Sequence, residues 1–103
     1  MKRLFIYGTL MLDDVQQRII GREVPMTPAT LQGYRKGRVT VEGKTYPRIT
    51  ADEAASVDGM VIELDDTEMQ RVDAYEGSEY VRIVVVLGDG TEAWVYAEPL
   101  SDD

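Results

Sequence analysis

The sequence contains no histidine and no cysteine among its 103 residues. Without them the chain has no Ser–His or Cys–His nucleophile pair, no thiolate and no disulfide framework. Zinc sites depend mainly on His and Cys ligands, so we expect no metal site. If the protein is an enzyme, proton transfer falls to a carboxylate, a tyrosine or a lysine.

Long apolar runs are also missing. No stretch reaches the roughly 18 apolar residues that a membrane span requires. The N-terminal stretch MKRLFIYGTL has a short apolar run that stops at Gly8, whereas a signal peptide needs a longer one and a small-residue cleavage site. We therefore expect a cytoplasmic protein with no membrane partner.

Positive charge is scarce: 11 Lys and Arg face 19 Asp and Glu, which gives a net charge of −8. A nucleic-acid-binding domain normally carries a basic stripe, so we expect no nucleic-acid partner. Residues 1–48 hold nine Lys and Arg and four Asp and Glu, whereas residues 49–103 hold two and fifteen. The cluster YRKGR at 34–38 could steer an anionic ligand, or it could be a solvated strand face.

The length suits a single domain over residues 1–103. Strand-type segments are expected at 3–7, 30–41, 45–49 and 57–64, and on both sides of a GDG turn within 79–99. Gly33 and Gly37 interrupt one of these segments and suggest bends or bulges. A turn signal covers 42–44, and 51–56 has the composition of a loop.

A first short helix is expected over 14–20, with Asp13 or Asp14 as its N-cap and Gly21 as its C-cap. Its apolar face would consist of Leu12, Val15, Ile19 and Ile20.

A second helix is expected to begin after Asp65 or Asp66 and to end at Gly77. Two short helices and many antiparallel strands in a small chain favour a curled sheet or closed barrel with helices packed outside. The expected fold class is therefore α+β, a small mixed, mostly antiparallel β-barrel with two flanking helices.

The stretch YGTL at residues 7–10 lies between the first strand and the first helix. A glycine there permits a sharp turn and a close approach by a ligand. The amide groups that follow would suit a carboxylate or a phosphate. The alternative is a strand-to-helix turn that simply needs a glycine.

Glu76 lies in the last turn of the second expected helix, just before Gly77. The negative end of the helix dipole disfavours a carboxylate there. Partial burial between Tyr75 and Tyr80 would disfavour its charge further. Both effects raise the pKa of Glu76 toward the range useful for proton transfer near neutral pH. The alternative is an exposed surface glutamate.

Taken together, these stretches resemble the gamma-glutamylcyclotransferase-like family, and the resemblance covers most of the chain. It rests on the combination and order of several motifs rather than on one of them. They are YGTL (7–10), LQGYR (31–35), YPRI (46–49), VDGMVIEL (57–64), DAYEGSEYVR (73–82) and AWVY (93–96).

The resemblance implies a small mixed β-barrel and an enzyme that uses neither cofactor nor metal. In such enzymes the α-amine of the substrate attacks its own γ-glutamyl carbonyl and releases 5-oxoproline and an amine. The resemblance implies that Glu76 is the general acid and base, and that Tyr7, Gly8, Thr9 and Leu10 hold the α-carboxylate. It also implies that Tyr80 and Tyr96 line the pocket.

The expected partner is a small γ-glutamyl compound, and the chain is expected to be a monomer or a weak homodimer. The family uses several γ-glutamyl substrates, and the sequence leaves the choice among them open. Two other functions stay open: a non-catalytic module that binds a small molecule in the same pocket, and an interaction protein with an acidic docking surface. An enzyme requires Glu76 to face a cavity beside the 7–10 segment. The binding module requires the cavity but tolerates Glu76→Gln, and the interaction protein requires neither.

Overall fold

The computed structural model describes residues 1–77 and 80–97, apart from the side chains at positions 39, 41, 44, 46 and 47. Its elements are β1 (Lys2–Ile6), a short 3₁₀ turn η1 (Thr9–Met11), α1 (Asp13–Ile19), β2 (Thr27–Val41), β3 (Lys44–Leu64), α2 (Asp66–Glu76), β4 (Val81–Val86) and β5 (Glu92–Ala97).

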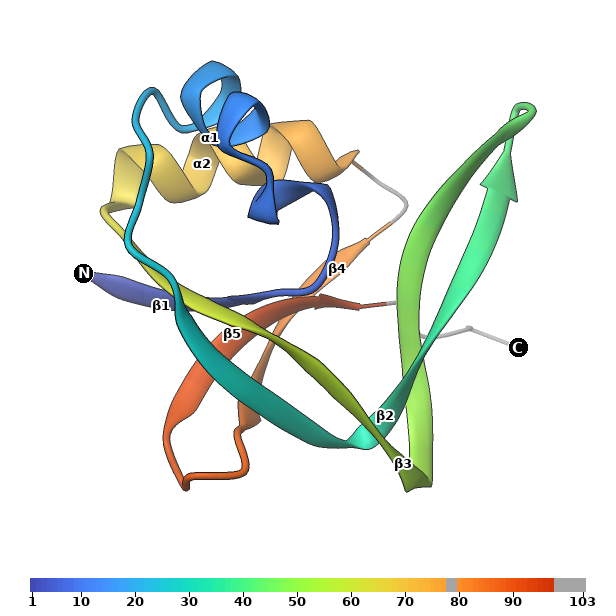
Figure 1. Cartoon of the computed structure of the whole chain (residues 1–103). Coiled ribbons are helices and arrows are strands. Elements are labelled where there is room, and N and C mark those ends of the chain that lie inside the picture. The colour runs from blue at the N-terminus through green and yellow to red at the C-terminus, as the bar shows by residue number, and fades with distance from the viewer. Residues whose placement is uncertain (78–79, 98–103) are drawn as a thin grey trace.

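The strands form one curled sheet in the order β2-β3-β1-β5-β4. The β1–β5 pair is parallel and the other three pairs are antiparallel. Helices α1 and α2 lie together over one face of the sheet (Figure 1). The predicted fold class, α+β with a mostly antiparallel curled sheet and two short helices, is confirmed.

The far ends of β2 and β3 extend beyond the rest of the sheet as a two-stranded arm, residues 34–51 (Figure 1). A shift in register separates the arm from the body, because Gln32 pairs with Ser56 whereas Tyr34 pairs with Ala51. Gly33 lies at this shift with a φ of 86°, so the bulge predicted there is confirmed. The arm therefore leaves the sheet at a conformation that glycine adopts readily.

The prediction of a loop at 51–56 is wrong, because β3 continues through these residues. The composition of this stretch, ADEAAS, is poor in the β-branched and aromatic residues typical of strands. Pairing with β2 on both sides of the register shift holds the stretch in a strand despite that composition. Local propensity is here overridden by pairing with a distant partner.

The predicted capping of α2 is confirmed at Asp65. Its side chain accepts a hydrogen bond from the backbone N–H of Glu68 at 2.8 Å, and the Glu68 side chain accepts one from the Asp65 N–H at 3.0 Å. Arg22 Nε donates to Glu68 Oε2 at 2.7 Å. This reciprocal capping box fixes the start of α2.

The predicted N-cap of α1 is wrong. The cap is Leu12, and Asp13 and Asp14 lie inside the first turn of the helix. They favour the helix there through its dipole rather than through a side-chain cap. None of the helices in the described part of the chain is long and apolar enough to cross a membrane.

The β4–β5 hairpin is confirmed. Its turn is closed by a 2.7 Å hydrogen bond from the Leu87 N–H to the Thr91 carbonyl. Gly88 N–H donates to the Thr30 carbonyl at 2.9 Å and so joins the turn to β2. The ends of the predicted hairpin, 79 and 98–99, lie outside the described residues.

The curl of the sheet creates two apolar clusters, one on each face. The first packs under the helices and contains Leu4, Ile6, Leu10, Val15, Ile20, Val24, Ile62, Leu64, Met69, Val72 and Tyr96. The second contains Phe5, Tyr7, Leu31, Ile49, Val57, Val85, Leu87, Ala93, Val95 and Ala97. Tyr7 and Tyr96 belong to different clusters, and the Tyr7 hydroxyl donates a hydrogen bond to the backbone carbonyl of Tyr96.

Candidate active site

The segment Tyr7–Leu10 follows directly from β1, the strand between β3 and β5 in the sheet. The ring of Tyr7 is buried, and its hydroxyl donates to the Tyr96 carbonyl at 2.6 Å. Leu10 is also buried in the core, and its carbonyl accepts a bond of 2.8 Å from Gln16 Nε2. Both ends of the segment are thus held by the core, so Leu10 can offer a ligand only its backbone.

Thr9 connects this segment to the end of α2. Its hydroxyl lies 2.8 Å from the Tyr75 hydroxyl, within hydrogen-bonding distance. Tyr75 belongs to the last turn of α2 and directly precedes Glu76. The 7–10 segment and the end of α2, which were predicted to form one site, are therefore in contact through the hydroxyl groups of Thr9 and Tyr75.

Glu76 is half-buried at the end of α2. Burial raises the pKa of the Glu76 carboxyl to about 7, and the upward shift expected from the sequence is confirmed. The charge of Glu76 in turn contributes to raising the pKa of the hydroxyls of Tyr7 and Tyr96, after the larger effect of burial. The carboxyl is thus close enough to act electrostatically on both tyrosines.

Gly77 ends the helix with φ 75° and ψ −165°. This combination is almost restricted to glycine. The chain turns away at that point, so Glu76 is the last helical residue, as the sequence predicted. A side chain at position 77 would strain the turn that places the carboxyl.

Tyr96 is bonded to α2 at Asp73, three residues before Glu76. Its hydroxyl donates to Asp73 Oδ1 at 2.5 Å, and Asp73 Oδ2 pairs with Arg82 at 3.4 Å. The guanidinium of Arg82 lies 4.7 Å from the centre of the Trp94 ring, a cation–π contact. Tyr96 is only 5% exposed. Through Asp73 it links β5 to α2, and Asp73 in turn pairs with Arg82 of β4, so these side chains hold α2 against the two strands.

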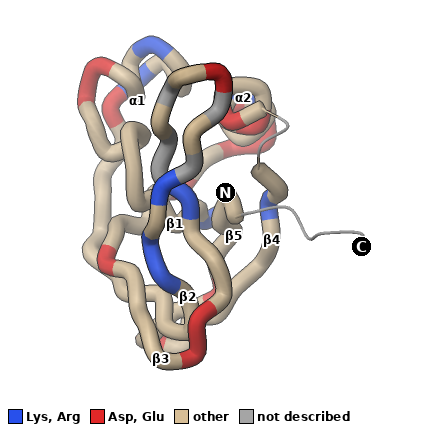
Figure 2. Tube along the Cα trace, turned by 90° about the vertical axis from the view of Figure 1, so that its right-hand side faces the viewer, with Lys and Arg blue, Asp and Glu red and all other residues tan. Residues whose placement is uncertain are grey.

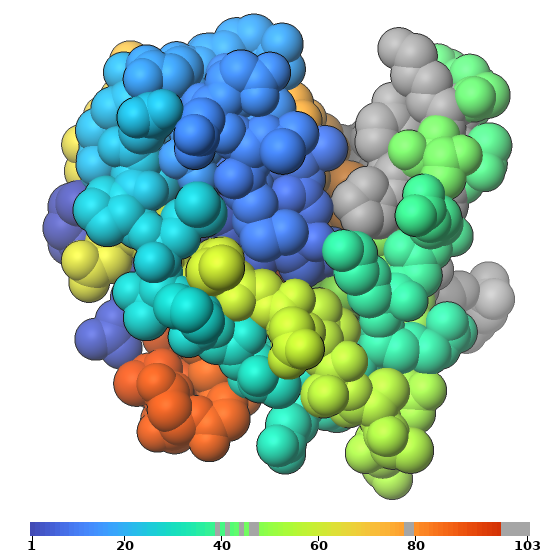
Figure 3. Space-filling view, viewed as in Figure 1, coloured from blue at the N-terminus to red at the C-terminus, as the bar shows by residue number. Residues whose placement is uncertain are grey.

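Tyr80 directly precedes β4 and packs against the first apolar cluster, the one under the helices. The guanidinium carbon of Arg48, from the arm, lies 5.9 Å from the centre of the Tyr80 ring. Figure 3 shows the arm, in green, on the other side of the molecule from the N-terminal segment, in blue.

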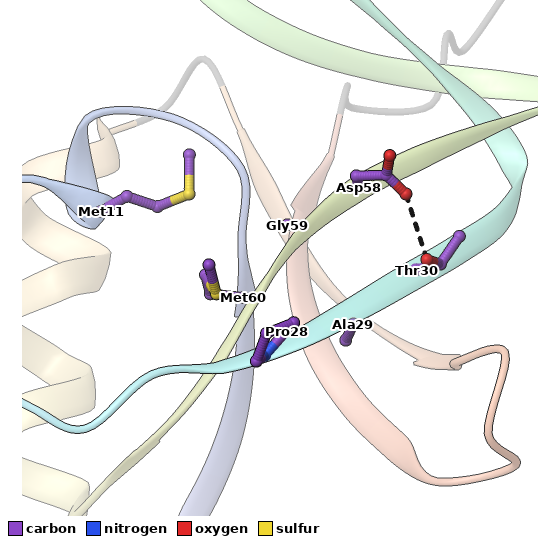
Figure 4. A pocket seen from close by; sticks show the side chains of 7 residues that line it. All are labelled: Met11, Pro28, Ala29, Thr30, Asp58, Gly59 and Met60. Atoms are coloured by element: carbon purple, nitrogen blue, oxygen red, sulfur yellow. Dashed lines mark hydrogen bonds between the residues drawn. The ribbon is translucent and has the colours of Figure 1, made fainter.

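A separate cavity of about 410 Å³ lies beside η1 and the paired strands β2 and β3 (Figure 4). It is lined by Met11, Pro28, Ala29, Thr30, Asp58, Gly59 and Met60. Thr30 donates to Asp58 Oδ1 at 3.1 Å across its floor. The residues predicted from the sequence are not among those lining it. Glu76, the carboxyl whose pKa burial raises to about 7, is not among them either, so we place the candidate site at Glu76.

Sequence reasoning did not predict the contacts of three polar residues of this region. Asp73 was recognisable as sharing a helix face with Glu76 by its i, i+3 spacing, but its bond to Tyr96 was not. Gln16 is fully buried, and its Oε1 accepts a 3.1 Å bond from the Val24 N–H. Arg48 lies in the motif YPRI, whose pattern gives no sign that the arginine lies over the Tyr80 ring. No group of three or more carboxylates able to hold a metal ion occurs among the described residues.

A sequence profile of the family described as gamma-glutamyl cyclotransferase, AIG2-like matches residues 4–102. The chain therefore belongs to this family. Among curated relatives, protein AIG2 C of Arabidopsis thaliana is 34% identical over 83 residues, 80% of this chain and 49% of that protein. AIG2-like protein D of the same plant is 33% identical over 95 residues, 89% of this chain and 61% of that protein. The chain thus spans about half to three fifths of the length of these relatives.

Solved structures share the fold. The solution structure of an Arabidopsis thaliana protein superposes with a TM-score of 0.81 at 29% identity, over 99% of this chain and 71% of that one. A structure described as gamma-glutamyl cyclotransferase has a TM-score of 0.79 at 18% identity, over 95% and 66%. At that identity the second likeness shows a common fold.

Proposed function

We propose that the protein is a gamma-glutamyl cyclotransferase that converts a small γ-glutamyl compound into 5-oxoproline and a free amine. The observation that carries the proposal is the carboxyl of Glu76, with a pKa of about 7, at a helix end bonded to the 7–10 segment through Thr9 and Tyr75. A carboxyl with this pKa both accepts and returns a proton near neutral pH. Family membership supports the same reaction class.

The reaction begins with transfer of a proton from the substrate α-ammonium to the Glu76 carboxylate. The freed α-amine attacks the γ-carbonyl carbon and a new C–N bond closes the five-membered ring, so that the carbonyl oxygen takes a negative charge and the ring nitrogen a positive one. The oxyanion then collapses, the bond to the leaving amine breaks, and Glu76 returns its proton to the leaving nitrogen. The Glu76 carboxylate then takes the second proton from the ring nitrogen and passes it to the released amine, which leaves as an ammonium ion. The nucleophile belongs to the substrate, which fits a chain without His or Cys.

The protein's main task is to hold the substrate folded. Intramolecular attack by a well-placed group has an effective molarity on the order of 10⁵ M or more. In this proposal the backbone of Tyr7–Leu10 holds the α-carboxylate, and an amide group there stabilises the oxyanion. The bonds from Tyr7 to Tyr96 and from Gln16 to Leu10 keep that backbone rigid.

The direct test is release of 5-oxoproline from a panel that contains γ-glutamyl dipeptides, γ-glutamyl-alkylamines, γ-glutamyl-lysine and glutathione. We expect multiple turnovers on at least one compound without added metal or cofactor. If no compound is converted but 5-oxoproline or glutamate binds, a binding module replaces the enzyme. If none is converted and none binds, the proposed site is wrong.

A further inference from the structure

The last turn of α2 holds a second carboxylate that the helix itself does not favour. This turn contains Asp73 and Glu76 and no basic residue. Aspartate has a low helix propensity, and the negative end of the helix dipole opposes its charge. The backbone carbonyl of Asp73 nevertheless accepts the bond from the Gly77 N–H that closes the helix. Stabilisation of the Asp73 side chain must therefore come from outside α2.

Two neighbouring strands supply that stabilisation. Arg82 of β4 and Tyr96 of β5 are directly paired across the strands, so their side chains lie on the same face of the sheet. The Tyr96 hydroxyl donates to one carboxylate oxygen of Asp73 at 2.5 Å, and Arg82 Nη2 lies 3.4 Å from the other. Figure 2 shows Asp and Glu, in red, on α2 and a basic stretch, in blue, on β4. Both oxygens of one carboxylate are thus held from two strands.

These bonds fix a rotation that apolar packing leaves open. Met69 and Val72 bury one side of α2 in the first apolar cluster, but apolar burial is not directional. Hydrogen bonds to an ionised carboxylate are directional and about twice as strong as neutral ones. The bonds at Asp73 therefore set the rotation of the last turn about the helix axis. Glu76 follows three residues later on the same face of the helix, so its carboxyl moves with Asp73.

We propose that Asp73 is a positioning residue for Glu76, because its bonds to β4 and β5 hold the last turn of α2 in the rotation that keeps the Glu76 carboxyl half-buried. The bond between Thr9 and Tyr75 reaches the same turn, but it is exposed to water, where a hydrogen bond contributes little net stability. The inference rests on the proposed function, since it concerns the group assigned to proton transfer. Asp73 acts through Glu76 and is assigned no contact with substrate.

The position of the Glu76 carboxyl can be read from its titration. Burial raises its pKa from 4.5 to about 7. If the last turn loses its anchor, the carboxyl moves toward water, and its pKa should fall back toward the ordinary value. This readout does not depend on turnover, so it separates the role of Asp73 from the reaction itself.

The neighbouring groups determine which variant is most informative. The groups that act with Glu76 on the hydroxyls of Tyr7 and Tyr96 are Tyr80, Arg48, Asp73 and Arg82. Arginine stays charged, and tyrosine stays neutral up to about pH 9. Replacing Asp73 itself removes a negative charge near Glu76, which would also lower the pKa of that carboxyl. Tyr96→Phe removes one bond to Asp73 and leaves every charge in place, so it is the primary variant, and Asp73→Asn is the second.

The test is a ¹³C NMR titration of the Glu76 carboxyl in the protein without substrate, with the resonance assigned from its absence in Glu76→Gln. We expect an apparent pKa of about 7 in the wild type and of about 6 or below in Tyr96→Phe and Asp73→Asn. The kcat for 5-oxoproline release should fall about 10- to 100-fold in both variants, as a misplaced catalytic group implies. The acidic limb of the kcat/KM profile should move to lower pH together with the titration.

Asp66→Asn is the matched control, because Asp66 lies in the first turn of the same helix, is exposed and pairs with Lys2 at 3.3 Å. It should leave the titration of Glu76 and kcat as in the wild type. A Glu76 carboxyl that titrates at the wild-type pH in Tyr96→Phe, or that already titrates near 4.5 in the wild type, overturns the role of Asp73.

The two proposals fail separately. If the wild type releases no 5-oxoproline, the proposed function is overturned, while the NMR titration still decides whether Asp73 positions Glu76. If kcat falls in Tyr96→Phe without a change in the titration, the role of Asp73 is overturned while the reaction stands. Arg82→Gln removes the other bond to Asp73 and gives the same readout even if Asp73→Asn folds poorly.

Discussion

Replacing Glu76 with glutamine is expected to lower the rate of 5-oxoproline release by about 10²- to 10⁴-fold, the range typical for loss of a general acid or base. Glutamine has nearly the same shape and leaves the bond between Thr9 and Tyr75 in place. It neither accepts the proton of the α-ammonium nor returns one to the leaving amine. The loss should therefore fall on kcat, with little change in the binding of substrate.

The same variant should be as stable as the wild type or more so at pH 8. Burial raises the folded-state pKa of Glu76 from an ordinary 4.5 to about 7. Between these values the folded state binds more protons than the unfolded state, so this group makes stability fall as pH rises. For a half-buried group we expect the free energy of unfolding of the wild type to fall by about 1–3 kcal/mol by pH 8. Glu76→Gln lacks the titrating carboxyl and should not show this fall.

The matched control is Glu63→Gln, which neutralises an exposed carboxylate that lies 4.0 Å from Arg3. It should leave turnover and the stability difference between pH 5 and pH 8 close to those of the wild type. Turnover is measured as the initial rate of 5-oxoproline release, and the stability difference is measured by urea unfolding at pH 5 and pH 8. Turnover in Glu76→Gln comparable with that of the control removes Glu76 from the mechanism.

Gly59→Ala is expected to have the largest effect on folding. An added Cβ would overlap the Ile6 carbonyl oxygen and would lie 2.7 Å from Cζ of the Phe5 ring. The backbone of Ile6 is paired with Met60 in the centre of the sheet, so it moves only by shifting the end of β1. Tyr7 and the rest of the 7–10 segment begin there, so activity should fall together with stability.

For this overpacked site we expect a loss of about 1–3 kcal/mol in the free energy of unfolding. The loss is measured by urea unfolding of the wild type and the variant. Gly37→Ala is the control within the same sheet, since its Cβ would meet Arg35 Nη1 at 3.6 Å and the Arg48 carbonyl at 3.9 Å, ordinary contact distances. If Gly59→Ala unfolds at the same urea concentration as the control, the close approach of β1 and β3 is not as described.

Much of the fold was accessible from local signals. The Asp65 cap, the end of α2 at Gly77, the GDG hairpin and the bulge at Gly33 each follow from short-range backbone chemistry. The course of β3 through 51–56 was not accessible, since its strand conformation depends on pairing with β2. Short-range patterns carry no information on such partners.

The first helix shows a second limit. The apolar face expected for it included Leu12, which is 53% exposed, whereas Gln16 is fully buried. Gln16 is buried because the Leu10 carbonyl and the Val24 N–H both need a partner in the core. The spacing of apolar residues cannot predict a polar side chain that is buried because it forms hydrogen bonds with backbone groups.

The candidate site also has features that could be predicted from the sequence and features that could not. The pairing of the 7–10 segment with the end of α2 was predicted by resemblance, and the structure brings these segments into contact through Thr9 and Tyr75. That Tyr96 lines the pocket stays a prediction; its hydroxyl bond to Asp73 was not accessible from the sequence. The contact between Arg48 and the Tyr80 ring depends on the course of the whole arm, which short-range patterns do not give.

The pH dependence of kcat/KM for 5-oxoproline release is the most direct test of the role assigned to Glu76. The acidic limb of this profile reports the pKa of the base in the free enzyme. The account predicts a rate that rises with pH through an apparent pKa of about 7, the value to which burial raises the Glu76 carboxyl. A limb near the ordinary value of 4.5, or a profile that is flat between pH 5 and pH 8, would contradict it.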